Sequence, residues 1–149
     1  MSVHQSAIRW QRAPHESDPG TYSRNHRVTL NGGQQVDVSA SVEFKGDPGC
    51  ADPEQMLVSA VSSCHMLFFL AIADFQGYRV DSYEDDPVAY LERNAAKGME
   101  VTRIELSPRI TFGGDNVPDP KAISRMHAGA HRNCFIRNSI TAEVTIHHL

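Results

Sequence analysis

The stretch from Asp52 to Phe75 constrains the fold more than any other, because it predicts a long helix that is apolar on almost every side. Asp52 and Pro53 supply an N-cap carboxylate and a proline at the first helical position, and Gly77 fits a helix stop. The intervening sequence is mostly apolar and has Cys64 near its middle. A helix that is hydrophobic all round is buried all round. The sequence therefore predicts a central, buried helix.

Composition predicts an ordinary globular domain. The chain has 149 residues, 40% of them hydrophobic and 21% charged, which is enough for one domain spanning residues 1–149 with a sizeable core. The net charge is −4 and the basic residues are scattered, so we expect no nucleic-acid partner. Uninterrupted apolar runs fall short of the roughly 20 residues that span a bilayer, so we expect no membrane segment.

The cysteines and the N-terminus indicate the compartment. Residues 1–11 carry no apolar core of signal-peptide length, which predicts a cytoplasmic protein. Cys50, Cys64 and Cys134 are an odd and sparse set. In a reducing compartment such a set argues against a disulfide framework and leaves metal binding or redox chemistry open.

The remaining patterns predict an α+β fold dominated by antiparallel pairing. A turn at Asn31-Gly32-Gly33 favours a hairpin. Asp119-Pro120 favours a second helix, through about His131. Strands are expected near residues 8–10 and 28–30, from Val36 to Phe44, at 78–83 and 88–90, through 104–112 with Pro108 as an edge or bulge, and at 140–146. The core stripe of the second helix is Ile123, Met126 or His127, Ala130 and, beyond the helix end, Cys134.

The apolar helix also predicts a partner. A single sheet with one exposed face cannot cover a helix that is apolar all round, so a second copy of the chain is expected to cover it. We expect an intertwined homodimer with this helix at its centre. Taken alone, Cys64 on the apolar helix is more typical of a small core residue than of a reactive thiol.

Three segments resemble the OsmC/Ohr superfamily of thiol-dependent peroxidases. They are Pro53-Glu54-Gln55-Met56-Leu57 with Ala60 and Ser63-Cys64, then Ala130-His131-Arg132-Asn133-Cys134, and Gly20-Thr21-Tyr22-Ser23-Arg24. The order of strands and helices is also similar, so the resemblance covers nearly the whole chain. The chain departs from the family pattern after Cys134, where Phe135-Ile136-Arg137 replaces a proline followed by a serine.

The resemblance implies a cysteine peroxidase, active in the antioxidant response to oxidative stress, without a cofactor or metal. Cys64 would attack an organic hydroperoxide and become a sulfenic acid. It would react less well with hydrogen peroxide. Cys134 would condense with this sulfenic acid to form a disulfide, which an external dithiol would then reduce. Arg24 and Glu54 would complete the site. Apolar side chains such as Met66, Phe68 and Phe69 would favour organic hydroperoxides.

Simple physics adds two expectations about this site. The thiolate is the nucleophile, and Cys64 lies too far along the helix for the helix dipole to stabilise it, so a cation must come from another element. Arg24 is the candidate. A buried arginine needs a carboxylate partner, and the family resemblance implies Glu54 for this role. Glu54 and Cys64 lie roughly 15 Å apart along one helix. If both contribute, Glu54 must act on the Cys64 of the partner chain.

Other interpretations stay open. The chain could be an OsmC-like homodimer without peroxidase activity that binds a metal or a hydrophobic ligand. His127 and His131, spaced i, i+4, could form part of a metal site with Cys134. Surface or interface histidines are the expected alternative. The charged segment 84–86 is expected to be a solvated turn.

Overall fold

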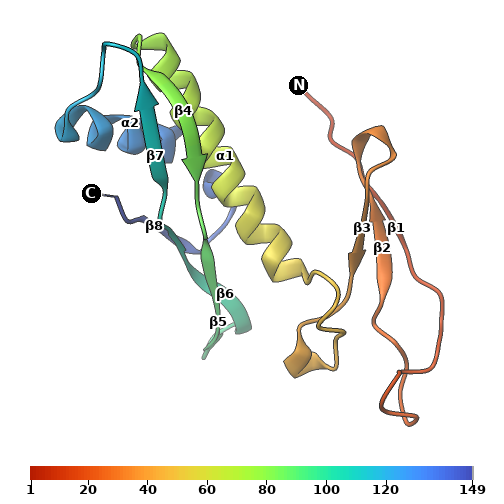
Figure 1. Cartoon of the computed structure of the whole chain (residues 1–149). Helices are drawn as coiled ribbons and strands as arrows, with labels where there is room; N and C mark the ends of the chain where they lie inside the picture. Colours follow the sequence, from red (N-terminus) through yellow and green to blue (C-terminus); the bar gives the residue numbers. More distant parts are fainter. Residues whose placement is uncertain (149) are drawn as a thin grey trace. The chain divides into compact units, whose positions relative to one another are not determined.

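The computed structural model describes residues 1–148, and the chain divides into two compact units, Met1–Met56 and Leu57–Leu149. It is a mixed α+β structure with two long helices and three small sheets, as the sequence predicts (Figure 1). Antiparallel pairing dominates. Among the strands formed by residues 1–148, the pair that runs parallel is β6 and β8, whose bounds are given below.

The first unit is built on a three-stranded antiparallel sheet. Its strands are β1 (Ala7–Arg9), β2 (His26–Thr29) and β3 (Gln35–Val38), in the order β1-β2-β3. A turn at Asn31–Gly33 joins β2 to β3, which confirms the predicted hairpin. Gly32 and Gly33 have φ angles of 69° and 74°, a region that favours glycine.

The strand predicted from Val36 to Phe44 is wrong in its second half. The backbone leaves the sheet after Val38, where Ser39 N–H donates to the Ala51 carbonyl at 2.8 Å, and Val42–Phe44 is a 3₁₀ turn. Val42 and Phe44 are 61% and 50% exposed. Their alternation with polar residues therefore does not mark a buried strand face.

Helix α1 (Pro53–Phe75) begins as predicted from its capping residues. The Gln55 backbone N–H donates to Asp52 Oδ1 at 2.7 Å, and the Asp52 N–H donates to Gln55 Oε1 at 3.1 Å. This reciprocal pair satisfies backbone donors that a helix start leaves free. The helix stops before Gly77, whose φ of 76° is left-handed.

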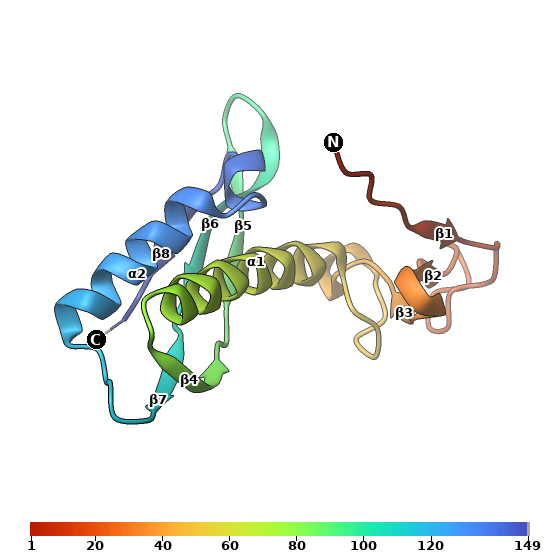
Figure 2. The ribbon, with the colours of Figure 1, turned by 90° about the horizontal axis from the view of Figure 1, so that it is seen from above.

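The second unit combines two small sheets with two helices. Strands β4 (Arg79–Glu84) and β7 (Arg109–Gly113) pair antiparallel. Strands β5 (Val88–Asn94), β6 (Gly98–Leu106) and β8 (Glu143–Ile146) form a sheet in the order β5-β6-β8. Helix α2 (Pro120–Asn133) starts at the predicted N-cap, where Asp119 Oδ1 accepts from the Ala122 N–H at 2.7 Å. It lies beside the C-terminal half of α1 (Figure 2).

The single strand predicted over residues 104–112 is two strands in two different sheets. The ladder of β6 ends at Leu106 and that of β7 starts at Arg109, so Pro108 lies in a break between strands rather than at an edge or bulge. Proline cannot donate to a ladder. The preceding Ser107 N–H donates to the Asp85 carboxylate at 2.7 Å instead.

Two apolar clusters hold the second unit together. One packs Val58 and Val61 of α1 against strand residues, chiefly Ile104, Leu106 and Val144. The other packs α1 against α2 through Phe69, Ala73, Met126 and Ala130. Each fully buried Val, Leu, Ile, Phe or Met side chain in these clusters stabilises the folded unit by roughly 1.5–3 kcal/mol.

Helix α1 is buried on one face rather than all round, so that prediction is wrong for a single chain. Val61, Phe69 and Ala73 are fully buried, but Leu67 is 60% exposed and Phe75 is 92% exposed. By length and composition alone α1 could cross a membrane, with 23 residues and a hydropathy of 2.0 over its most apolar part. This corrects the expectation that no segment reaches that length, and such helices also occur in protein cores. The predicted second copy of the chain stays a prediction.

Candidate thiol site

Cys134 lies in a buried position directly after α2. Its side chain is 1% exposed, and Sγ accepts the Arg137 backbone N–H at 3.3 Å. The same sulfur is 4.0 Å from the carbonyl oxygen of Val61 in α1. Cys134 therefore rests against the turn of α1 that leads to Cys64.

Cys64 is the immediate neighbour of Cys134. It follows Val61 by three residues on α1, is partly exposed, and lies close enough to Cys134 to raise the pKa of that thiol. Both cysteines are free, as is Cys50, which lies in a loop of the first unit. The structure thus brings together Cys64 and Cys134, the two cysteines that the resemblance pairs. Cys50 is not part of this pair.

The environment of Cys134 separates the roles of the two thiols. The pKa of Cys134 is raised to about 11, chiefly because the thiol is buried. The backbone N–H of Arg137 partly offsets this rise, and the neighbouring Cys64 adds to it. Cys134 is consequently a protonated thiol at neutral pH. If this pair attacks an electrophile, the partly exposed Cys64 is the nucleophile.

Two aromatic rings adjoin the cysteine pair. Phe68 lies one helical turn after Cys64, and Phe135 directly follows Cys134; the rings meet edge to face with centroids 4.9 Å apart. Phe135 is 71% exposed. Phe69, which sequence analysis grouped with Phe68, is instead fully buried and packs in the core. Phe68 and Phe135 thus form the apolar surface beside the thiols.

Arg24 and Glu54, the other predicted site residues, both lie in the first unit. The Arg24 guanidinium donates to Thr21 Oγ1 at 2.9 Å and to the Tyr22 carbonyl, and lies 4.1 Å from the centre of the Tyr22 ring. Glu54 Oε2 is buried and has no hydrogen-bond partner within residues 1–148. No ion pair joins Arg24 to Glu54 in that range. Their action on Cys64 stays a prediction.

A buried histidine pair, which sequence analysis did not predict, lies next to the thiol-bearing turn. His65 and His127 are each 2% exposed, and His65 Nε2 is 3.0 Å from His127 Nδ1. The rings are within 7° of parallel with centroids 5.3 Å apart, which is the nitrogen–nitrogen distance lengthened by the two ring radii. The rings therefore meet end to end, in a nearly linear N–H···N hydrogen bond. The prediction that His127 is a surface or interface residue is wrong.

Burial keeps this histidine pair uncharged. It lowers the pKa of His65 to about 4 and that of His127 to about 3. Neighbouring histidines contribute to both shifts, and Asp85 partly offsets them at His65. The sequence signal that could have indicated the burial of His65 is its helical spacing, because His65 shares the buried face of α1 with Ser62 and Phe69.

Asp85 is a structural residue rather than part of a solvated turn. Its Oδ2 accepts the hydroxyl of the buried Ser62 at 2.5 Å, and its Oδ1 accepts the Ser107 N–H. Its neighbours Glu84 and Asp86 do have exposed side chains, 71% and 82%. The prediction for segment 84–86 is therefore wrong for the buried bonds of Asp85 and for Glu84, which ends strand β4, and holds for the exposure of the Glu84 and Asp86 side chains.

No metal centre is formed by residues 1–148, because no three histidine, cysteine or acidic side chains are arranged to hold an ion. The facing nitrogens of His65 and His127 are bonded to one another. The Cys134 sulfur is directed at α1. The metal grouping considered for His127, His131 and Cys134 is thus not present.

Comparisons with known proteins place this fold and cysteine pair in a family. A model of the OsmC-like protein family matches residues 44–148, which include both cysteines. The chain belongs to the OsmC-like protein family. An OsmC-like protein of unknown function from Vibrio cholerae is 39% identical, with a TM-score of 0.91 and full coverage of both chains.

More distant OsmC-like structures share the fold. An organic hydroperoxide resistance protein from Legionella pneumophila is 18% identical, with a TM-score of 0.67 over 98% of this chain and 97% of its own. The organic hydroperoxide resistance protein OhrB of Bacillus subtilis is 14% identical, with a TM-score of 0.69 over 97% and 96%. A comparison with curated protein sequences gives no match.

Proposed function

We propose that this OsmC-like chain is a thiol-dependent peroxidase that reduces organic hydroperoxides, with Cys64 as the nucleophile and Cys134 as the resolving cysteine. The observation that carries the proposal is the contact between a partly exposed Cys64 and a buried, protonated Cys134. Two neighbouring free thiols are the arrangement from which a disulfide forms on oxidation.

The reaction has two chemical steps and a reductive return. The Cys64 thiolate attacks the terminal oxygen of the hydroperoxide, the O–O bond breaks, and the alkoxide leaves as an alcohol after taking up a proton. Cys64 is then a sulfenic acid. The Cys134 sulfur attacks the Cys64 sulfur, and hydroxide leaves as water with the Cys134 proton. An external dithiol reduces this disulfide by two exchanges and is itself oxidised.

A homodimer would complete this site. Glu54 Oε2 is buried without a partner in residues 1–148, and a buried carboxylate oxygen needs a hydrogen-bond donor or a cation. The exposed apolar side chains Leu67 and Phe75 on α1 also need cover. In the proposed dimer, Glu54 of one protomer orients an Arg24 that stabilises the Cys64 thiolate of the other protomer.

The three free cysteines support a reducing compartment, and we place the protein in the cytoplasm, where dithiol reductants are available. The aromatic surface of Phe68 and Phe135 favours a hydroperoxide with an apolar body. Hydrogen peroxide lacks such a body and would react less well.

The test is peroxide consumption with dithiothreitol as the reductant. The wild-type chain should consume cumene hydroperoxide catalytically, and Cys64→Ser should abolish consumption with an unchanged circular dichroism spectrum. Cys50→Ser is the matched control and should retain full activity, because Cys50 lies in a separate loop. Full activity of Cys64→Ser would overturn the proposal and leave a non-peroxidase OsmC-like protein.

A further inference from the structure

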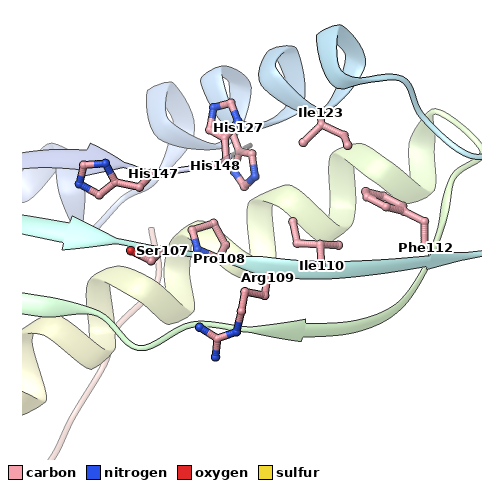
Figure 3. A pocket seen from close by; sticks show the side chains of 9 residues that line it. All are labelled: Ser107, Pro108, Arg109, Ile110, Phe112, Ile123, His127, His147 and His148. Carbon is pink, nitrogen blue, oxygen red and sulfur yellow. The ribbon is translucent and has the colours of Figure 1, made fainter.

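A pocket in the second unit has no role in the thiol chemistry. It has a volume of about 580 Å³ and lies between β7, the first half of α2 and the segment that follows β8 (Figure 3). This volume is within the range of small-molecule sites. Neither Cys64 nor Cys134 lines it.

The pocket is mainly apolar at one end and carries histidines at the other. Pro108, Ile110, Phe112 and Ile123 supply the apolar surface. His127 and His148 stack at the histidine end, with ring centroids 4.6 Å apart (Figure 3). A ligand that fits this arrangement has a hydrocarbon body and one polar end.

The histidine end has unused hydrogen-bonding capacity. His127 is 2% exposed, and its Nε2 has no partner within residues 1–148; the same holds for Nδ1 of His148. His127 Nδ1 is already bonded to His65. Buried polar atoms without partners are rare, so these two nitrogens indicate a missing polar group at this end of the pocket.

The charges around the pocket favour an uncharged ligand. The Arg109 guanidinium is directed away from the two histidines (Figure 3). It is already neutralised by Asp86 at 2.8 Å and Glu84 at 3.6 Å. Burial keeps His127 neutral, because it lowers the pKa of that imidazole to about 3. His147, which also lines the pocket, lies 3.6 Å from the Glu105 carboxylate. An anion would therefore lose its hydration without gaining an unpaired guanidinium.

A hydroxyl group suits these nitrogens because it is a small neutral group with both a donor and acceptors. The proton shared by His65 and His127 decides whether His127 Nε2 is a donor or an acceptor. A hydroxyl can donate or accept, so it pairs with Nε2 in either case. We propose that this pocket binds a small neutral alcohol, with its hydrocarbon body against Ile110, Phe112 and Ile123 and its hydroxyl at His127.

The test compares three probes that share a 4-isopropylphenyl body: 4-isopropylbenzyl alcohol, p-cymene and 4-isopropylbenzoate. Binding is followed by NMR through the methyl groups of Ile110 and Ile123. The alcohol should shift these methyls saturably and bind about ten-fold more tightly than p-cymene, the gain of roughly one net hydrogen bond. The benzoate should bind more weakly than the alcohol.

Two variants locate the site. His127→Phe should remove the preference for the alcohol, and His127→Gln, which keeps a donor and an acceptor, should retain it. Ile123→Trp should fill the pocket and block all three probes, whereas Val117→Trp, at a position 62% exposed, should not. The proposal is overturned if the benzoate binds most tightly, if alcohol and p-cymene bind equally to wild type, or if no probe gives saturable shifts. None of these readouts involves peroxidase activity, so the result stands apart from the proposed function.

Discussion

The rings of Phe68 and Phe135 meet at 89° with centroids 4.9 Å apart, and each belongs to a segment that carries one of the paired cysteines. Phe135 occupies the position where the family resemblance leads one to expect proline. Its exposed face, 71% of the residue, offers apolar surface beside the thiols. This contact gives the first prediction about substrate preference.

Phe135→Ala should lower the preference for cumene hydroperoxide over hydrogen peroxide. Loss of one aromatic contact weakens binding of the aryl body, so the ratio of the two kcat/KM values should fall about five-fold. Steady-state kinetics with both peroxides measure it. Phe44→Ala removes a half-exposed ring from the other unit and should leave the ratio unchanged. An unchanged ratio in Phe135→Ala would exclude this ring from substrate selection.

Cys134→Ser should allow one turnover and then stall. Without the second thiol, Cys64 stays as a sulfenic acid or is over-oxidised. Dimedone labelling and intact mass after one equivalent of cumene hydroperoxide measure this. Unchanged steady-state turnover with a dithiol would show that Cys134 is structural.

Arg24→Ala should slow alkylation of Cys64 by iodoacetamide at neutral pH. Removal of the guanidinium removes the charge that favours the thiolate. Glu54→Ala should slow alkylation less, because it removes the residue that orients Arg24 and leaves the charge. Equal rates in wild type and Arg24→Ala would separate Arg24 from the site.

A mixed dimer tests whether the site is shared between chains. One protomer carries Glu54→Ala and the other carries Cys64→Ser, so the single remaining Cys64 faces an intact Glu54 from its partner. That cysteine should be alkylated at the wild-type rate. A rate equal to that of the Glu54→Ala homodimer would mean that Glu54 does not act across the interface.

The His65–His127 pair should make the fold sensitive to mild acid. Both pKa values are lower in the folded chain, about 4 and about 3, than the ordinary 6.5. Between pH 6.5 and 5 the unfolded chain therefore binds more protons, and stability falls as pH falls. The loss is about 1.4 kcal/mol per pH unit for each histidine.

Urea unfolding at pH 5, 6 and 7 measures this loss. His127→Gln should reduce the pH dependence by about half, whereas His4→Gln, at an exposed position, should not change it. A free energy of unfolding that stays constant from pH 7 to 5 would mean that the pair is protonated in the folded chain.

Local sequence signals predicted the elements well because each acts over a few residues. The capping motifs Asp52-Pro53 and Asp119-Pro120 correctly predicted where both helices start, and the turn at residues 31–33 correctly predicted the first hairpin. The resemblance paired Cys64 with Cys134, and the structure brings them into contact.

Contacts between residues far apart in the chain could not be predicted from the sequence. His65 and His127 are separated by 62 positions, so neither residue carries a local sign of the other. Asp85 looked like its charged neighbours, and only its bonds to Ser62 and Ser107 distinguish it. Alternation through Pro108 did not reveal that the chain moves to another sheet there, because both strands keep the same period.

A disulfide map tests most directly whether Cys64 and Cys134 form a disulfide on reaction with a hydroperoxide. The reduced chain is treated with one equivalent of cumene hydroperoxide, blocked with iodoacetamide, and digested without reductant for mass spectrometry. A Cys64–Cys134 link within one chain, with Cys50 fully alkylated, is the predicted result. Free Cys64 and Cys134 after the peroxide is consumed, or a link through Cys50, would contradict it.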